Sequence, residues 1–135
     1  MLRQTELKRF DVVAGILLDG DGRVLITERV GDGPFHGLWE FPGGKINGDE
    51  SLEAALRREL SEELGVDTIA SAHFMKLDHT YPDRHVSIDF YLVTEWMNEP
   101  AALEGQRMRW VSIGELDADI LLPADLPVVE ALKAV

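Results

Sequence analysis

The stretch from Ser51 to Leu64 constrains the fold more than any other part of the sequence, because it predicts a long helix. It contains neither Gly nor Pro, and leucine recurs at every fourth position, at Leu52, Leu56, Leu60 and Leu64. This spacing places the leucines along one face of a helix, where they can pack against a core. Gly65 follows directly, and glycine is the residue type that most often ends a helix. We therefore expect an amphipathic helix over residues 51–64.

Apolar and β-branched residues predict two hairpins, one on each side of this helix. Residues 10–18 and 23–29 flank the run DGDG, whose Asp and Gly residues suit a tight turn. Residues 69–79 and 85–96 flank the run YPDR, which suits a turn containing proline. In both cases we expect two antiparallel strands that pair directly with each other.

Shorter segments complete the order of elements. We expect a strand at residues 107–111, one helical turn at 112–116, and a final helix at 126–134 opened by Asp125 and Pro127. In residues 39–44, one proline and two glycines argue against any regular element. The order of strands, long helix, strands and helix predicts the α+β class, with a mixed β-sheet between helices in an α/β/α sandwich.

The composition predicts one domain over residues 1–135 and excludes several classes of protein. Of 135 residues, 45% are hydrophobic, and 25 acidic against 13 basic residues give a net charge of −12. This charge repels polymeric nucleic acid and anionic membranes, since the basic residues are scattered. The lack of cysteine excludes disulfides and thiolate metal sites and fits a reducing compartment. No apolar run is long enough for a signal peptide or a membrane span, so we expect a soluble, cytoplasmic protein.

The predicted helix carries three glutamates on one face. Glu59, Glu62 and Glu63 stand at positions i, i+3 and i+4, so at about 100° per residue they share roughly a third of the circumference. Like charges at these spacings destabilise a helix, and the helix dipole disfavours anions near the C-terminal end. Arg58 can pair with Glu62, which would make this a solvated salt-bridge face. The alternative is a site for a hard divalent cation bound by carboxylate oxygens.

The loop before the helix decides between these alternatives. Gly43, Gly44 and Lys45 do not form a P-loop, because Ile46 follows the lysine where Ser or Thr is required. Residues 44–66, GKINGDESLEAALRRELSEELGV, instead resemble the Nudix box at every defining position. The resemblance implies the Nudix fold, with a loop-helix-loop that holds Mg²⁺ against the pyrophosphate of a nucleoside diphosphate linked to another group.

The same resemblance implies a role for each residue of the motif. The implied metal ligands are three side chains and one backbone carbonyl: Glu59, Glu62, Glu63 and Gly44. One of these glutamates, or a nearby carboxylate, is implied to activate water. Arg58 is implied to orient the glutamates by ion pairing and thus to belong to the catalytic group. Glu50 and Gly65 are implied as structural residues, with Glu50 tying the loop to Arg58.

Outside the box, the sequence resembles the MutT branch of the Nudix family. Four segments carry this similarity: GLWEFPGGKI, YPDRH, EGQRMRW and PADLPVVEAL. MutT-type enzymes remove pyrophosphate from nucleoside triphosphates, notably 8-oxo-dGTP. The similarity implies that Glu104 is a further metal ligand or water-activating carboxylate and that Arg29, Phe41 and Arg84 contact the nucleotide. Without the resemblance, Phe41 would be interpreted as a core residue and the two arginines as surface charges.

Asp125 departs from the pattern of the 8-oxo-dGTP enzymes that this chain resembles. Those enzymes have an Asn in a PAN-x-P segment, which donates to O6 and accepts from N7–H of the oxidised purine. An ionised Asp accepts but does not donate, so it would suit the amino group of cytosine, and PADLP also resembles CTP- and dCTP-hydrolysing relatives. A protonated Asp125 would restore the donor. The structural alternative is that Asp125 caps the final helix.

These patterns together predict an enzyme that converts a nucleoside triphosphate and water to the monophosphate and pyrophosphate with Mg²⁺, or with Mn²⁺. The first-ranked substrate is 8-oxo-dGTP, which implies a role in cleaning the nucleotide pool for DNA replication and repair. The second is CTP, dCTP or a modified form of them, because of Asp125. A different alternative is a nucleotide-sensing module without catalysis, although all three helix glutamates are retained. We expect a monomer or homodimer whose partners are small nucleotides.

Overall fold

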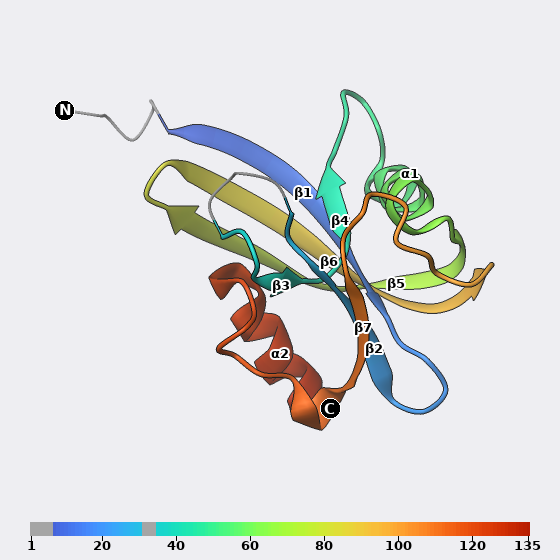
Figure 1. The fold of residues 1–135 in the computed structure, drawn as a ribbon. Coiled ribbons are helices and arrows are strands. Elements are labelled where there is room, and N and C mark those ends of the chain that lie inside the picture. Colours follow the sequence, from blue (N-terminus) through green and yellow to red (C-terminus); the bar gives the residue numbers. More distant parts are fainter. Residues whose placement is uncertain (1–6, 31–34) are drawn as a thin grey trace.

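The computed structural model describes residues 7–30 and 35–135, and within these ranges two β-sheets lie between two α-helices (Figure 1). The first sheet has the strand order β4 (Gly43–Lys45), β1 (Lys8–Leu17), β6 (Arg84–Met97) and β5 (Asp67–Tyr81). The second has the order β3 (Trp39–Glu40), β2 (Arg23–Glu28) and β7 (Met108–Ser112). The helices are α1 (Leu52–Leu64) and α2 (Leu126–Lys133). The predicted α+β class is confirmed, with seven strands divided between two sheets in the described ranges.

Alternating side chains of β1 supply two apolar layers. Val13 packs with Leu56 of α1 in one buried cluster. Ala14 and Ile16 lie in a second cluster with Val128 of α2. Because successive side chains of a strand point to opposite faces, one central strand can contribute to both layers. The two helices therefore cover different faces of the sheet region, as Figure 1 shows.

The predicted long helix is confirmed as α1, with both of its ends defined by local chemistry. The Ser51 hydroxyl accepts a hydrogen bond from the Ala54 amide at 3.1 Å, which caps the first turn. Gly65 adopts a left-handed conformation with φ of 71°, and its amide donates to the Ser61 carbonyl at 2.9 Å. Neither α1 nor the shorter α2, within the ranges described, combines the length and apolar character of a membrane-crossing helix.

The second predicted hairpin is confirmed, whereas the first is wrong. Strands β5 and β6 pair antiparallel from Asp67 opposite Met97 to Tyr81 opposite Arg84. In contrast, β1 and β2 belong to different sheets and are connected by an isolated bridge at the turn. The reason is that β1 pairs in parallel with β6 along one edge and antiparallel with β4 along the other. Both backbone edges of β1 are thus occupied by strands that are distant in sequence.

The expectation that residues 39–44 contain no regular element is also wrong. They contribute the short strand β3 and the start of β4, which pairs with Val13 and Ala14 of β1. A Cβ atom at Gly43 would overlap the Val13 carbonyl oxygen, so glycine permits this close pairing. The strand predicted at 107–111 is β7, and the turn predicted at 112–116 is a 3₁₀ helix at Ile113–Glu115. A second 3₁₀ helix, Pro123–Asp125, precedes α2.

Candidate active site

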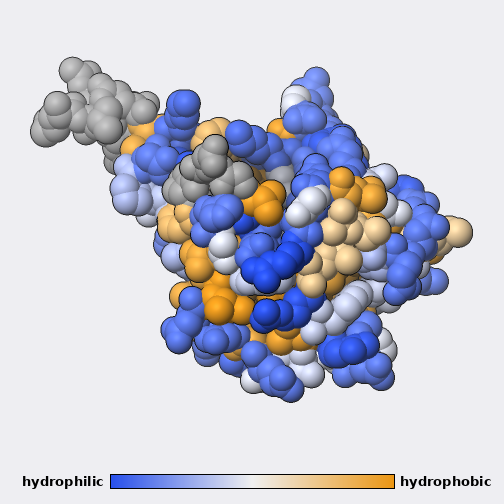
Figure 2. Space-filling view, in the orientation of Figure 1, coloured by the Kyte–Doolittle hydropathy of each residue, from blue (hydrophilic) through white to orange (hydrophobic). Residues whose placement is uncertain are grey.

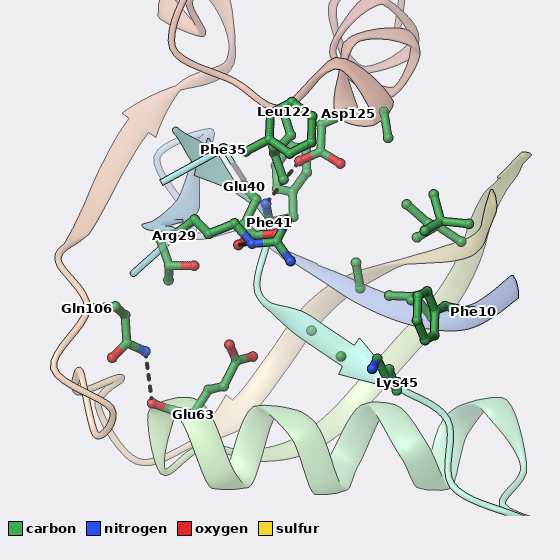
Figure 3. A pocket seen from close by; sticks show the side chains of 18 of the residues that line it. Phe10, Arg29, Phe35, Glu40, Phe41, Lys45, Glu63, Gln106, Leu122 and Asp125 are labelled. Atoms are coloured by element: carbon green, nitrogen blue, oxygen red, sulfur yellow. Dashed lines mark hydrogen bonds and ion pairs between the residues drawn. The ribbon is translucent and has the colours of Figure 1, made fainter. Parts of the chain in front are cut away.

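A pocket of about 340 Å³ lies beside the C-terminal half of α1 and is lined by strands of both sheets. Seven of the predicted site residues line it: Arg29, Phe41, Gly44, Glu63, Arg84, Glu104 and Asp125. Seen from close by, Glu63 and Asp125 lie at opposite ends of the pocket, with Arg29 and Phe41 between them (Figure 3). In the space-filling view, strongly hydrophilic side chains gather in the middle of this face and hydrophobic ones surround them (Figure 2).

The three helix glutamates share one face of α1 but end in different surroundings. Glu63 points into the pocket (Figure 3). The Glu59 carboxylate lies directly beside the backbone of Gly44, where a Cβ atom would overlap it, and its side chain is only 15% exposed. The Glu62 side chain is 55% exposed and does not line the pocket. The structure thus brings Glu63 into the pocket, places Glu59 behind the pocket residue Gly44, and leaves Glu62 exposed outside the pocket.

Arg58 connects the loop before α1 to two of these glutamates. Its Nε and Nη2 donate to both carboxylate oxygens of Glu50, at 2.7 and 2.9 Å. Its Nη1 donates to Glu59 at 2.8 Å and to Glu62 at 3.3 Å, and its Nη2 also donates to the Lys45 carbonyl at 2.9 Å. The bidentate pair between Arg58 and Glu50 lowers the pKa of Glu50 below its ordinary value. The predicted contacts of Arg58 and Glu50 are therefore present in the structure.

Glu63 is held in a position that disfavours its charge. The pKa of Glu63 is raised to about 8, mainly by burial and then by the nearby carboxylates of Glu59, Glu104 and Glu40 in that order. The Gly43 amide acts in the opposite direction and is the weaker influence. The Oε2 atom of Glu63 is buried and has no hydrogen-bond partner among the described residues. A buried carboxylate oxygen without a partner needs a cation or a proton to compensate its charge.

The predicted residue Glu104 reaches the pocket from the loop between β6 and β7. The Glu104 amide donates to Oε1 of Gln106 at 2.9 Å, and Nε2 of Gln106 donates to the Glu63 carbonyl at 3.3 Å. The second of these bonds is drawn in Figure 3. A loop distant in sequence thereby places a fourth carboxylate near the helix glutamates.

At the opposite end of the pocket, Asp125 is buried and does not cap α2. Its side chain is in no capping hydrogen bond, and its backbone is helical, with φ of −89° and ψ of −11°. One carboxylate oxygen instead accepts from the Phe41 amide at 3.4 Å. Burial raises the pKa of Asp125 well above its ordinary value, and the Glu40 charge adds to this. The capping interpretation is therefore wrong, and Asp125 faces the pocket.

Glu40 and Arg29 form an ion pair beside Asp125. The Arg29 Nε lies 3.6 Å from a carboxylate oxygen of Glu40, and both residues line the pocket. Burial raises the pKa of Glu40, while Arg29 lowers it. This end of the pocket thus holds two carboxyl groups, one guanidinium and the buried ring of Phe41, which is 3% exposed. Such a mixture of polar groups and aromatic surface suits a planar, hydrogen-bonding ligand.

Arg84 lies at a third side of the pocket, near Phe10 and Lys45. Arg84 donates to the neighbouring Asp83 at 2.9 Å, and its Cζ lies 5.8 Å from the centre of the Phe10 ring. The Nζ of Lys45 lies 4.1 Å from the same ring centre. Two cations over one aromatic ring, both lining the pocket, can attract a phosphorylated or otherwise anionic group.

The donor set fits a hard divalent cation in its chemistry. The unpaired oxygen of Glu63, the adjacent Glu59 and the nearby Glu104 are all oxygen donors, and the absent side chain at Gly44 opens access to Glu59. In the conformation described for residues 7–30 and 35–135, however, no three acidic or histidine side chains converge closely enough to hold a metal ion. Arg58 contacts the carboxylates of Glu59 and Glu62, so cation binding would have to compete with those ion pairs.

Glu40 and Gln106 are among the pocket residues that the sequence did not predict. Glu40 lies within the segment GLWEFPGGKI, but its neighbour Phe41 was singled out instead, and one glutamate beside a tryptophan carries no signal of a site. Gln106 lies in EGQRMRW, two positions after Glu104. Its proximity to a predicted ligand was the one available signal, because an uncharged amide gives no indication of chemistry by itself.

This chain is similar to known proteins over most of its length. Residues 13–131 match a family model described as NUDIX domain. The 8-oxo-dGTP diphosphatase of Escherichia coli K12 is 39% identical over 127 residues, which cover 94% of this chain and 98% of that protein. The CTP pyrophosphohydrolase of the same strain is 35% identical over 128 residues, covering 95% and 94%.

The solved structures include close matches as well. One comes from a study of MutT from the fish pathogen Aliivibrio salmonicida and the mesophile Vibrio cholerae. It is 40% identical to this chain, has a TM-score of 0.81, and covers 94% of this chain and 98% of its own.

Proposed function

Because this chain belongs to the NUDIX domain family, we propose that it hydrolyses a nucleoside triphosphate to the monophosphate and pyrophosphate, with 8-oxo-dGTP as the preferred substrate. The observation that carries the proposal is a single pocket with two chemically different ends. Glu63, Glu59 and Glu104 gather at one end and suit a metal-bound polyphosphate. Phe41 and the buried Asp125 lie at the other end and suit a base.

The cofactor is a divalent cation, and we propose Mg²⁺, with Mn²⁺ as a substitute. Residues that would hold it are the Gly44 carbonyl and the carboxylates of Glu59, Glu62, Glu63 and Glu104. The bound ion supplies positive charge that neutralises the polyphosphate and stabilises the charge that develops on its oxygens during hydrolysis.

The protein residues orient the reacting groups around this centre. Arg58 holds Glu59 and Glu62 by ion pairs and is anchored through Glu50, so the carboxylates keep a defined arrangement. One carboxylate of the group accepts the proton of the attacking water, because water at neutral pH is a weak nucleophile. Lys45 and Arg84 add positive charge at the side of the pocket where Phe10 lies.

A neutral Asp125 would suit the oxidised purine as substrate. Because its raised pKa favours the neutral acid, Asp125 can donate one hydrogen bond and accept another, as an asparagine does. A neutral acid is a poorer partner for the cytosine amino group, which favours a charged acceptor. The similarity to a CTP pyrophosphohydrolase keeps CTP and dCTP as the second candidates.

The biological setting proposed here follows from this substrate. Hydrolysis of 8-oxo-dGTP removes an oxidised precursor before the precursor is incorporated into DNA. The protein would then act in the cytoplasm and protect the accuracy of replication. We also propose that residues 1–135 act as one domain, in a monomer or homodimer, on small nucleotides and not on nucleic acid polymers.

The deciding experiment measures kcat/KM with Mg²⁺ for 8-oxo-dGTP, dGTP, CTP and dCTP. We expect kcat/KM for 8-oxo-dGTP to exceed that for each of the other three nucleotides by at least about tenfold, on the order of the net contribution of one well-placed hydrogen bond. A tenfold preference for a cytosine nucleotide would select the second candidate. Failure to release pyrophosphate from any of the four, or from other common nucleoside triphosphates, would instead favour a nucleotide-sensing module.

A further inference from the structure

The loop after β6 is seated on the C-terminal end of α1. The amides of Ala101 and Leu103 donate to the carbonyl oxygens of Leu64 and Glu63, at 2.9 and 3.1 Å. The last carbonyls of a helix have no partners within the helix itself, so an adjacent segment or water must provide them. Here the loop that carries Glu104 provides them. The backbone position of this loop is therefore tied to that of Glu63.

Gln106 adds a side-chain link between the same two elements. Its amide donates to the Glu63 carbonyl at 3.3 Å and accepts from the Glu104 amide at 2.9 Å. A primary amide supplies donor and acceptor together, which neither a carboxylate nor an apolar side chain can do. Gln106 is only 6% exposed, so water cannot readily replace either bond.

When both are ionised, the carboxylates of Glu63 and Glu104 repel each other. This repulsion favours movement of the loop away from α1, since the loop has no strand or helix of its own between Asn98 and Arg107. Gln106 opposes that movement because it binds the main chain of both glutamates at once. Gln106 thus adds to the backbone hydrogen bonds of Ala101 and Leu103 in holding together two groups that electrostatics would push apart.

We propose that Gln106 is a positioning residue that holds the Glu104 carboxylate in register with Glu63 for the bound cation. The inference rests on the proposed function, in which both carboxylates belong to the metal-binding group. The Gln106 side chain contacts backbone atoms of Glu63 and Glu104. Its effect on catalysis is therefore transmitted entirely through these two glutamates.

The test compares Gln106→Leu, which removes both hydrogen bonds at similar volume, with Asn98→Gly as a matched control. Asn98 Nδ2 also links this loop to the end of α1, by donating to the Gly65 carbonyl at 3.3 Å, but it lies far from Glu104 in the loop. Asn98 has a φ of 74°, which glycine adopts without strain. Gln106→Glu is the second variant, since it keeps the shape and the acceptor but loses the donor.

Two readouts do not require turnover. Amide hydrogen exchange of residues 99–106 should accelerate at least about tenfold in Gln106→Leu and change little in Asn98→Gly. Mn²⁺ affinity, measured by titration of the metal alone, should fall about tenfold in Gln106→Leu, the usual effect of losing a residue that orients a ligand. These readouts keep the inference testable even if the wild-type protein hydrolyses no nucleotide.

The kinetic readout is a double-mutant cycle with Glu104→Gln. Gln106→Leu should lower kcat by about tenfold or more with little change in KM for the nucleotide, and Gln106→Glu should not restore it. Adding Gln106→Leu to Glu104→Gln should cost little further activity, because both act through one carboxylate. Additive losses of activity in the double mutant would contradict the proposal. Equal effects of Gln106→Leu and Asn98→Gly on hydrogen exchange and Mn²⁺ affinity would also contradict it, since Gln106 would then only stabilise the loop.

Discussion

Glu63 is the residue at which the requirements of folding and of the proposed chemistry conflict most directly. Its side chain is partly buried near other carboxylates, and one of its oxygens is fully buried without a partner among the described residues. In the protein without a bound cation, an uncharged residue of the same shape would make the folded state more stable at this position. A cation bound during the proposed reaction would explain the carboxylate at this position.

Glu63→Gln is expected to leave the fold intact and to lower kcat by at least about a hundredfold. The amide keeps the shape of the side chain but removes a charge that a bound cation needs. Steady-state kinetics with Mg²⁺, together with circular dichroism as a check of folding, would measure the effect. Turnover close to that of the wild type would exclude Glu63 from the active site.

Asp125 makes a second prediction at the scale of the residue. Because its pKa is raised, Asp125 keeps its proton to a higher pH than an exposed Asp does, and it loses the donor as the pH rises through that pKa. For 8-oxo-dGTP, the ratio of kcat/KM of Asp125→Asn to that of the wild type should therefore increase by about tenfold as the pH rises through the pKa of Asp125. The asparagine variant shares the metal-binding group, so the ratio cancels other titrations. A ratio independent of pH would contradict a neutral Asp125 as the base-recognition group.

At the scale of elements, the site depends on the close contact of β4 with β1 and α1. Gly43 lies against the backbone of β1, and Gly44 lies against the Glu59 carboxylate of α1. Neither position has room for a Cβ atom. A strand without side chains at these two positions lets a helix carboxylate approach the backbone directly.

Gly44→Ala is expected to displace the Glu59 carboxylate from its pair with Arg58. We expect a fall in kcat of about tenfold or more and a loss of about 1–3 kcal/mol in the free energy of unfolding, typical of overpacking. Kinetics and urea denaturation would measure the two effects. The control is Gly20→Ala, where a Cβ atom meets nothing within 4 Å and little change is expected in either quantity. Equal behaviour of the two variants would show that Glu59 does not need this approach.

At the scale of the whole molecule, the net charge of −12 is not spread evenly, because some carboxylates gather at the pocket and others pair with arginines. Several of the carboxylates face one another across one pocket, where their repulsion opposes folding in the absence of a cation. Others, such as Glu50, are paired with an arginine. In the proposed function, the negative charge would make the protein dependent on a cation before it could accept an anionic substrate.

This distribution predicts how stability responds to pH. The pKa of Glu63 is raised from its ordinary value of 4.5 to about 8, so the folded state holds a proton that the unfolded state releases between these values. Without divalent cations, the stability contributed by this group is fully present below about pH 4.5 and is lost as the pH rises through about 8. In EDTA, the midpoint of thermal unfolding of Glu63→Gln should therefore exceed that of the wild type by a margin that grows from about pH 5 to about pH 9.

Mg²⁺ should reverse this difference, because a ligand that binds only the folded state raises its stability. At about pH 9, millimolar Mg²⁺ is expected to raise the unfolding midpoint of the wild type by more than that of Glu63→Gln. Differential scanning fluorimetry would measure both. An equal response of the two proteins to Mg²⁺ would show that the cation binds elsewhere.

Much of the fold and of the site was predictable because it depends on local patterns. The leucine spacing and Gly65 predicted α1, and the turn YPDR predicted the β5–β6 hairpin, since side chains near in sequence determine these elements. The Nudix box indicated the cluster around Glu59 and Glu63 for the same reason. The first hairpin was predicted wrongly because a local turn signal does not reveal that β6, distant in sequence, occupies the edge of β1.

The sequence by itself determined the family, the α+β class, the amphipathic helix and the concentration of carboxylates that calls for a cation. Only the tertiary structure decided that Asp125 faces the pocket and does not cap α2, that Glu40 and Gln106 line the pocket, and that Glu62 is exposed outside it. The physical reason is that helix periodicity and turn chemistry act over a few residues. Burial, and with it the charge state of Asp125 and Glu63, depends on segments that meet after the chain has folded.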